Sequence, residues 1–118
     1  VRYLPPARRE ELVSRLEAFD AFLLPYRVNP FLMGVVPAKL YECLAMGRPI
    51  LATPLPCFAA FGRMVYVSAD PAEWVRMAGE WPQTERPALR EERIALAREH
   101  ACGREFQRLL EALRGVWE

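Results

Sequence analysis

The sequence predicts an α/β fold of three layers, in which helices cover both faces of a parallel sheet. Short apolar runs without polar alternation, such as residues 21–24 and 50–52, are typical of parallel strands buried on both faces. Helical segments separate these runs at a spacing that favours right-handed crossovers between parallel strands. A chain of 118 residues is long enough for one such domain with a core of its own.

The first part of the chain is expected to hold a strand end, a helix, a buried strand and a long loop. Residues 2–4 are predicted as the strand end, and residues 8–19 as the helix. The buried strand covers residues 21–24 and stops at Pro25, and the loop covers residues 26–36. The inner face of the first helix is expected to comprise Leu12, Val13, Leu16 and Phe19.

The stretch from Pro37 to Thr53 is predicted as a helix, a glycine stop and a strand. Pro37 suits the first helical position, and Gly47 stands where a left-handed residue ends a helix. Leu40, Cys43 and Leu44 share one face at helical spacing and should point inward. Residues 50–52 then form the second buried strand.

The remainder alternates loops, one strand and three helices. A loop with a helical turn at residues 57–61 leads to a strand at 64–67. Asp70 and Pro71 form the start signal of a helix over 72–79, which a linker over 81–87 follows. Two amphipathic helices are expected at 89–101 and 104–116. The last one carries an apolar stripe of Phe106, Leu109, Leu110, Leu113 and Trp117.

A ligand site is expected where the loop 26–36 meets the helix that starts at Pro37. In open α/β sheets ligands bind beyond the carboxyl ends of the strands. A helix N-terminus offers unpaired N–H groups and a positive dipole end, which suit an anion such as a diphosphate. Lys39 and Glu42 lie on the opening turns of that helix. An ordinary surface pair of the two is the alternative interpretation.

Five segments together resemble a known family. They are VRYL, FDAFLLPY, PAKLYECLAMGRPILATPLP, VYVSADPAEW and REERIALAREH, in that order. The chain resembles the C-terminal nucleotide-sugar-binding domain of GT-B glycosyltransferases, of the retaining group 1/group 4 type that builds bacterial polysaccharides and glycolipids. The resemblance implies a Rossmann-like sandwich with a parallel sheet, of which this chain is the second half plus C-terminal helices. Residues 1–87 are then the partial nucleotide-sugar-binding domain, and residues 88–118 are a helical tail.

The resemblance also implies roles for single residues. The family has two glutamates eight positions apart, of which the second binds the nucleotide ribose and the first contacts the donor sugar. Glu42 matches the second, and a carboxylate offers two acceptor oxygens to a ribose diol. The first would fall at Gly34, so that carboxylate is missing here. The P-x-K-x-x-E form (Pro37, Lys39, Glu42) resembles the branch of the family that lacks it.

Further donor contacts are expected from the loop, each with a plainer alternative. Gly34, Val35 and Val36 would act through backbone N–H groups, and Gly34 would permit close approach, unless it is only a turn residue. Arg27 and Asn29 could meet a phosphate or a sugar hydroxyl, or be merely solvated. Lys39 would neutralise phosphate or remain solvated. Tyr26 would stack or hydrogen-bond near the base or sugar, or be a half-buried structural tyrosine.

The implied activity is transfer of a sugar from a nucleoside-diphosphate sugar to a hydroxyl acceptor, in cell-envelope polysaccharide or glycolipid synthesis. The implied partners are the nucleotide-sugar donor and an N-terminal acceptor domain that this sequence lacks, onto which the terminal helix would cross back. Packing of that helix on the local sheet is the alternative. A catalytic Arg and Lys of the family lie outside this sequence. No catalytic residue is therefore assigned here, and we expect the chain alone to be inactive.

Composition excludes several other functions. A formal net charge of +1 argues against a nucleic-acid surface and provides no polybasic membrane patch. The three cysteines have no metal-ligand spacing and indicate reduced thiols, and the family needs no metal or cofactor. His100 is expected to be structural or at the surface. The chain begins at Val1 without Met, which predicts an excerpt of a longer cytoplasmic protein. That protein could contact the inner face of the plasma membrane peripherally.

Two other classes remain as alternatives. A UDP-sugar 2-epimerase shares the architecture but needs additional acid and base residues, and none is evident in this sequence. A non-enzymatic receiver-like α/β module needs an acidic cluster at the strand ends, whereas Asp20 begins a strand. Both alternatives therefore rank below the glycosyltransferase.

Overall fold

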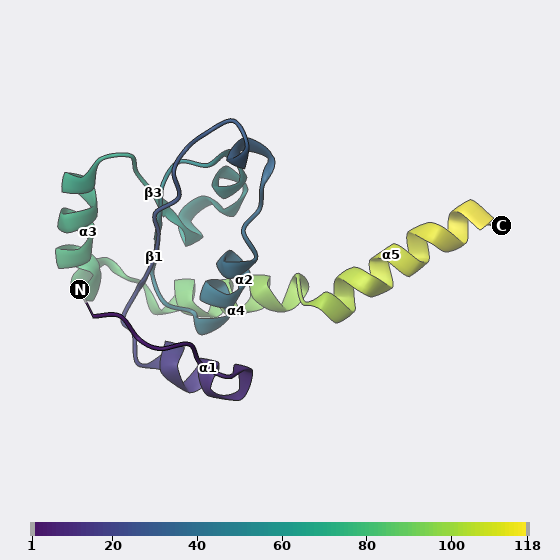
Figure 1. Cartoon of the computed structure of the whole chain (residues 1–118), viewed down its shortest axis with the longest axis horizontal. Coiled ribbons are helices and arrows are strands. Elements are labelled where there is room, and N and C mark those ends of the chain that lie inside the picture. Colours follow the sequence, from purple (N-terminus) through teal and green to yellow (C-terminus); the bar gives the residue numbers. More distant parts are fainter. Residues whose placement is uncertain (1, 118) are drawn as a thin grey trace.

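The computed structural model describes residues 2–117, and the side chains of residues 82–84, 115 and 117 are outside that description. Three short strands alternate with five α-helices and two 3-10 segments, labelled η (Figure 1). The elements in chain order are α1 (Arg9–Glu17), β1 (Phe22–Leu24), η1 (Leu32–Gly34), α2 (Ala38–Met46), β2 (Ile50–Ala52), η2 (Pro56–Met64), β3 (Tyr66–Val67), α3 (Pro71–Thr84), α4 (Pro87–Glu99) and α5 (Cys102–Trp117).

The strands form one parallel sheet in the order β1-β2-β3. Phe22 pairs with Ile50, and Leu51 pairs with Leu23 on one side and Tyr66 on the other. Each step to the next strand passes through a helical segment, α2 between β1 and β2 and η2 between β2 and β3. The predicted α/β class with a parallel sheet is therefore confirmed.

The main core lies between one face of the sheet and the segments α2 and η2. Buried side chains from the sheet, from α2 and from the η2 region meet there. They are Phe22, Leu24, Ile50, Ala52 and Val65 from the sheet side, Leu40, Cys43 and Leu44 from α2, and Leu55 and Phe58 from the approach to η2 and η2 itself. The inward face predicted for α2 is confirmed, because all three of its predicted residues are buried.

The opposite face of the sheet is covered unevenly. On that face Leu51 is buried in the centre, and the ring of Tyr66 lies 6.3 Å from the ring of Trp81 in α3. Leu23, which pairs with Leu51, is 58% exposed. The helix α3 is therefore the third layer, and it covers the β3 side of this face but not the β1 side.

Some predicted elements differ from the structure. Residues 2–4 form no strand, and Tyr3 is 91% exposed, because within the described chain no strand lies beside them to supply hydrogen bonds. Val1 lies outside the described residues. On α1 the predicted inner face is half correct: Leu12 and Leu16 are half-buried, whereas Val13 and Phe19 are exposed.

The predicted stop at Gly79 is also wrong. The helix α3 continues to Thr84, so the segment predicted as a linker from residue 81 is helical at its start. Asp70 caps this helix as predicted, and its Oδ1 accepts a 2.8 Å hydrogen bond from the Ala72 amide. A glycine within a helix costs about 1 kcal/mol. Beyond it, Trp81 packs on Tyr66 of the sheet.

The last helix does not pack on the sheet. Figure 1 shows α5 extending away from the body of the molecule. Phe106, Leu109 and Leu113 of its apolar stripe are 57%, 53% and 42% exposed. The alternative that the stripe packs on the local sheet is therefore wrong for these residues. The side chain of Trp117 lies outside the description.

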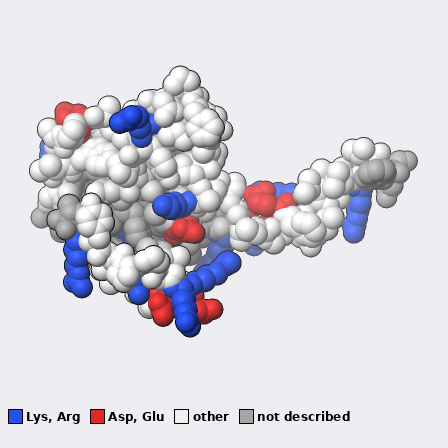
Figure 2. All heavy atoms as spheres, in the orientation of Figure 1, with Lys and Arg blue, Asp and Glu red and all other residues white. Residues whose placement is uncertain are grey.

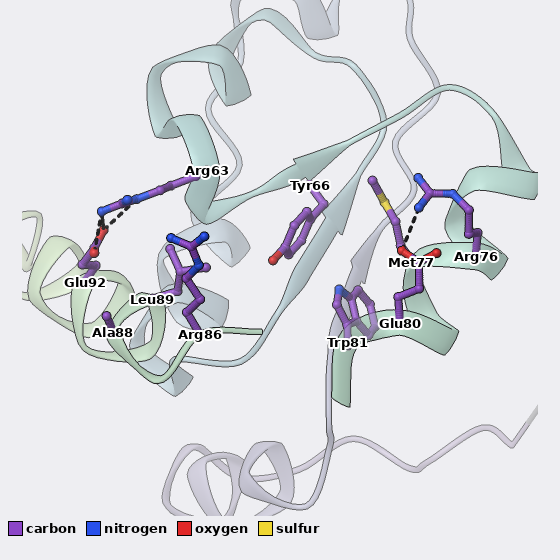
Figure 3. Close-up of a pocket in the computed structure, with 10 residues that line it drawn as sticks. All are labelled: Arg63, Tyr66, Arg76, Met77, Glu80, Trp81, Arg86, Ala88, Leu89 and Glu92. Carbon is purple, nitrogen blue, oxygen red and sulfur yellow. Dashed lines mark hydrogen bonds and ion pairs between the residues drawn. The ribbon is translucent and has the colours of Figure 1, made fainter. Parts of the chain in front are cut away.

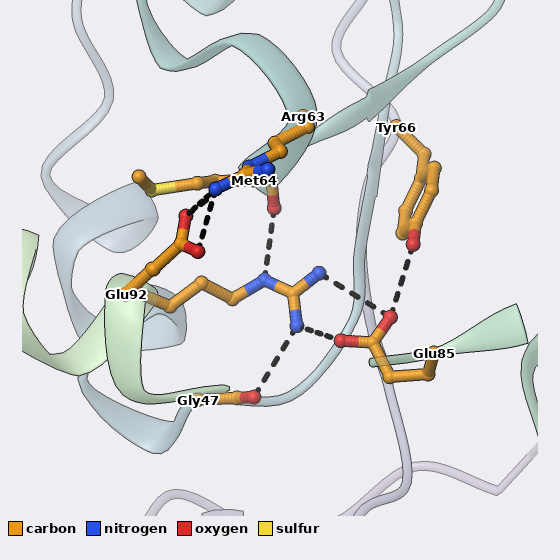
Figure 4. A network of polar contacts seen from close by, with 7 residues as sticks. Gly47, Arg63, Met64, Tyr66, Glu85 and Glu92 are labelled. Carbon is orange, nitrogen blue, oxygen red and sulfur yellow. Dashed lines mark hydrogen bonds and ion pairs between the residues drawn. The ribbon is translucent and has the colours of Figure 1, made fainter. Parts of the chain in front are cut away.

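Arg93 of α4 is fully buried and joins several elements, and its partners Gly47, Met64 and Glu85 are labelled in Figure 4. Its Nε donates to the Met64 carbonyl at 3.0 Å, and its Nη1 donates to the Gly47 carbonyl at 3.3 Å. It also forms an ion pair with Glu85, whose other oxygen accepts a 3.0 Å hydrogen bond from the Tyr66 hydroxyl. Each of the three guanidinium nitrogens thus has an acceptor, since Nη2 also lies 3.5 Å from Oε2 of Glu85, and a buried charge requires such compensation.

Replacing Arg93 by Met should destabilise the fold strongly. The substitution removes the cation and leaves the Glu85 carboxylate without its charged partner, a loss of roughly 3 kcal/mol or more. Urea unfolding followed by circular dichroism measures it. Arg104→Met on α5, an exposed arginine, is the control and should change stability by less than about 0.5 kcal/mol. Equal losses in both variants would contradict this prediction.

Gly47 ends α2 in the left-handed conformation with φ of 69°. A Cβ at this position would lie 2.6 Å from Cγ of Arg90 and 3.2 Å from its carbonyl oxygen. Gly47→Ala should therefore cost at least about 1–2 kcal/mol of stability. Gly79→Ala is the matched control, since a Cβ there meets nothing within 4 Å and should stabilise α3 by about 0.5–1 kcal/mol. The same unfolding measurement should give opposite signs for the two variants.

Candidate functional site

The helix α2 begins one residue later than predicted. Pro37 is its N-cap, with an extended ψ of 127°, and Ala38 is the first helical residue. Lys39 and Glu42 are both exposed on its opening turns. Within the described chain they form no ion pair with each other, so the surface-pair alternative has no contact to support it. Both charged groups stay available to a ligand.

The loop between β1 and α2 is tied to the sheet at its start. The Thr53 hydroxyl, directly after β2, donates to the Tyr26 carbonyl at 2.7 Å and lies 3.4 Å from the Leu24 carbonyl. Tyr26 is half-buried and packs against the core, which corresponds to its structural alternative. Arg27 beside it is exposed. The loop therefore leaves the carboxyl end of β1 in a fixed direction.

The middle of the loop is organised by its own hydrogen bonds. Oδ1 of Asn29 accepts from the Leu32 amide at 3.0 Å and so begins η1. The Val35 amide donates to the Leu32 carbonyl at 3.1 Å, so this N–H already has a partner. Gly34 and Val36 are exposed. A Cβ on Gly34 would meet nothing within 4 Å, and its φ is not positive, so the fold itself does not require glycine there.

Glu42 lines a groove of about 650 Å³ on the side of α2 that faces away from the sheet. The walls come from α2, from the end of α4, from the start of α5 and from Arg9 of α1. The polar and aromatic lining residues besides Glu42 are Arg9, Tyr41, Arg98, His100 and Cys102. Of the residues predicted as donor contacts, all of which the structure describes, Glu42 alone lines this groove.

His100 and Tyr41 were not predicted as part of any site. Their ring centroids lie 5.1 Å apart, and Nδ1 of His100 lies 3.0 Å from Oε1 of Glu105. One signal in the sequence could have identified Tyr41. It stands at helical spacing with Ala38, Glu42 and Ala45, which together form the stripe opposite the buried face of α2. His100 gives no comparable signal, because its position depends on how α4 packs on α2.

Cys43 lies on the inner side of α2, where its side chain is buried. Burial, and to a smaller extent the neighbouring Glu42 carboxylate, raise the pKa of its thiol from the ordinary 9.0 to about 11. Lys39 acts in the opposite direction. The thiol is therefore neutral at physiological pH and is a packing group rather than a nucleophile.

This raised pKa predicts both reactivity and pH dependence. At pH 8 the exposed Cys102 should react with Ellman's reagent at once, and Cys43 only on unfolding.

Above about pH 9 the thiol of Cys43 loses its proton in the unfolded chain, while in the folded chain it keeps the proton up to about pH 11. Stability should therefore fall as the pH rises through this range. Cys43→Ala should show a smaller fall, and an identical fall would contradict the assignment.

The described residues contain no group of three or more His, Cys, Asp or Glu side chains placed to hold a metal ion. On the face shown in Figure 2, basic and acidic side chains are interspersed rather than gathered by sign. Among the described residues, no helix combines the length and apolar character that crossing a membrane requires.

No protein-family model and no solved structure matches the chain. The chain is similar to a protein of Bacillus subtilis (strain 168) named "Putative teichuronic acid biosynthesis glycosyltransferase TuaH", with 39% identity over 51 residues. These residues make up 43% of this chain and 13% of that protein, so the match spans a small part of the relative. The similarity confirms the predicted resemblance to glycosyltransferases. The finer GT-B assignment stays a prediction.

Proposed function

We propose that this chain is the donor-binding part of a glycosyltransferase that moves a sugar from a nucleoside-diphosphate sugar to a hydroxyl acceptor. The similarity to a protein named as a glycosyltransferase supports the reaction class. The single observation that carries the proposed site is the position of Glu42. Its carboxylate is exposed on the second turn of α2 and lines a groove, with no ion pair in the described chain to occupy it.

The carboxylate of Glu42 would accept hydrogen bonds from the two hydroxyls of a ribose. Two oxygens on one rigid helix suit a vicinal diol, and the charge strengthens each bond. Lys39 is exposed one turn nearer the start of α2, where the helix dipole is positive. In this proposal Lys39 and the first amides of α2 face the diphosphate, whose charge grows as the sugar departs.

The loop would complete the donor site. Gly34 is exposed with open space around its Cα, which supports close approach of a ligand to the backbone near Val36. Arg27 is exposed and would meet a phosphate or a sugar hydroxyl. Asn29 and Val35 have internal partners for the Asn29 Oδ1 and the Val35 amide. We therefore propose that Asn29 and Val35 mainly shape the loop and that Arg27 makes most of its contacts with the ligand.

The proposed donor site needs neither a metal nor a cofactor, since Lys39, Arg27 and the start of α2 supply the positive charge. The acceptor domain and the catalytic cations would come from outside this sequence. The exposed apolar stripe of α5 would face that domain. The relative's name refers to teichuronic acid biosynthesis, and we propose cell-envelope polysaccharide synthesis for this chain as well. Turnover of a nucleotide sugar by this chain alone would contradict this division of roles.

Binding of free nucleotides tests the site directly. At least one of UDP, GDP and ADP should raise the melting temperature of the chain, because a ligand that binds only the folded state stabilises it. Glu42→Gln should weaken that binding about tenfold or more, since it removes a charged hydrogen-bond acceptor. Isothermal titration calorimetry then gives the affinity.

Glu91→Gln is the matched control, because Glu91 is an exposed carboxylate on α4 outside the groove. Its affinity for the nucleotide should be unchanged. Stabilisation by Mg²⁺ alone, with no response to any nucleotide, would instead favour the receiver-like module. Equal affinity of the Glu42→Gln variant and the unmodified chain would remove Glu42 from the site.

A further inference from the structure

A second cavity lies at the opposite end of the sheet from the proposed donor site. Its volume is about 540 Å³, within the range of small-molecule sites. Tyr66, the first residue of β3, and Arg63 just before it form one wall. The second half of α3 and the first turns of α4 form the others (Figure 3). The proposed donor contacts instead follow the carboxyl end of β1, so the two sites are separate.

The charges around this cavity do not cancel. Three arginines line it, each from a different element: Arg63 from η2, Arg76 from α3 and Arg86 from the N-cap of α4. Glu92 pairs with Arg63 at 2.6 Å, and Glu80 pairs with Arg76 at 2.7 Å. Arg86 has no ion pair or hydrogen bond to any other described side chain. One positive charge therefore remains for a ligand.

The interior of the cavity is apolar except for one donor without an acceptor. Met77, Leu89 and the ring of Trp81 line it alongside Tyr66. Nε1 of Trp81 is buried and has no hydrogen-bond partner among the described residues. An unsatisfied buried donor costs about 1–3 kcal/mol. The atom is closed to a water-sized group, so a ligand oxygen reaches it only when the indole turns within the cavity, and the new hydrogen bond then relieves that cost. Figure 3 shows this nitrogen on the side of the ring that faces Tyr66.

We propose that this cavity binds an amphipathic monoanion, namely a ligand with an apolar body and one carboxylate, sulfonate or phosphodiester group. The apolar body packs against Met77, Leu89 and Trp81. The anionic group pairs with Arg86 and accepts the hydrogen bond of the Trp81 indole. A single negative charge matches the single uncompensated arginine, whereas a dianion would leave one charge without a partner. This proposal does not rest on the proposed donor site.

Naphthoate is a suitable probe, and naphthylmethanol is its neutral counterpart of the same shape. The indole N–H signal of Trp81 in the proton–nitrogen NMR spectrum of the chain is assigned by its loss in Trp81→Phe. Naphthoate should shift this signal saturably, and naphthylmethanol should bind at least tenfold more weakly. Arg86→Gln should weaken naphthoate binding about tenfold, because it removes a charge-assisted hydrogen bond. Arg104→Gln, with the same loss of charge on α5, should leave the affinity unchanged.

Each other outcome would overturn the proposal. Equal affinity for naphthoate and naphthylmethanol, or unchanged affinity in Arg86→Gln, would show that no anion is recognised. An equal shift by inorganic phosphate would show that the apolar wall contributes nothing. No shift of the Trp81 signal in a folded chain would show that the cavity does not bind this class of ligand. The remaining amide signals report that each variant is folded.

Discussion

The Arg93 guanidinium is the contact on which the arrangement of the helices depends. It reaches from α4 to the carbonyl that ends α2, to the last carbonyl of η2 and to the Glu85 carboxylate that also holds Tyr66 of β3. A buried cation tolerates few alternative positions, because each displaced hydrogen bond leaves a charge without compensation. The position of α4 relative to α2 is therefore fixed by polar geometry as well as by apolar packing. The two walls of the groove beside Glu42 that α2 and α4 supply depend on this position.

The close contact between α2 and α4 has a second requirement. The absence of a side chain at Gly47 lets Arg90 and Ile94 of α4 approach the end of α2. The left-handed φ of this glycine turns the chain into β2 at the same point. One residue thus serves both the turn and the helix contact, which explains why the glycine stop was clear from the sequence while its partner helix was not.

The sequence predicted those parts of the fold that local patterns determine. The strands at 22–24 and 50–52, the inward face of α2 and the cap at Asp70 all follow from neighbouring residues. The burial of Arg93 could not be predicted, since an arginine in an amphipathic helix is expected at the surface and its partners lie in η2 and directly after the ends of α2 and α3. The cavity with Arg86 and Trp81 was missed for the same reason, because its walls are brought together only by tertiary packing. For the donor site the sequence supplied Glu42, and the structure added the groove around it.

The separation of α5 from the body has a practical consequence. None of its described side chains is buried, so a chain ending at Ala101 would keep every buried side chain among the described residues. The apolar surface of α5 would favour self-association in concentrated solution. A shortened chain would thus offer a cleaner sample for crystallisation, with the 540 Å³ hollow and the Glu42 carboxylate both retained.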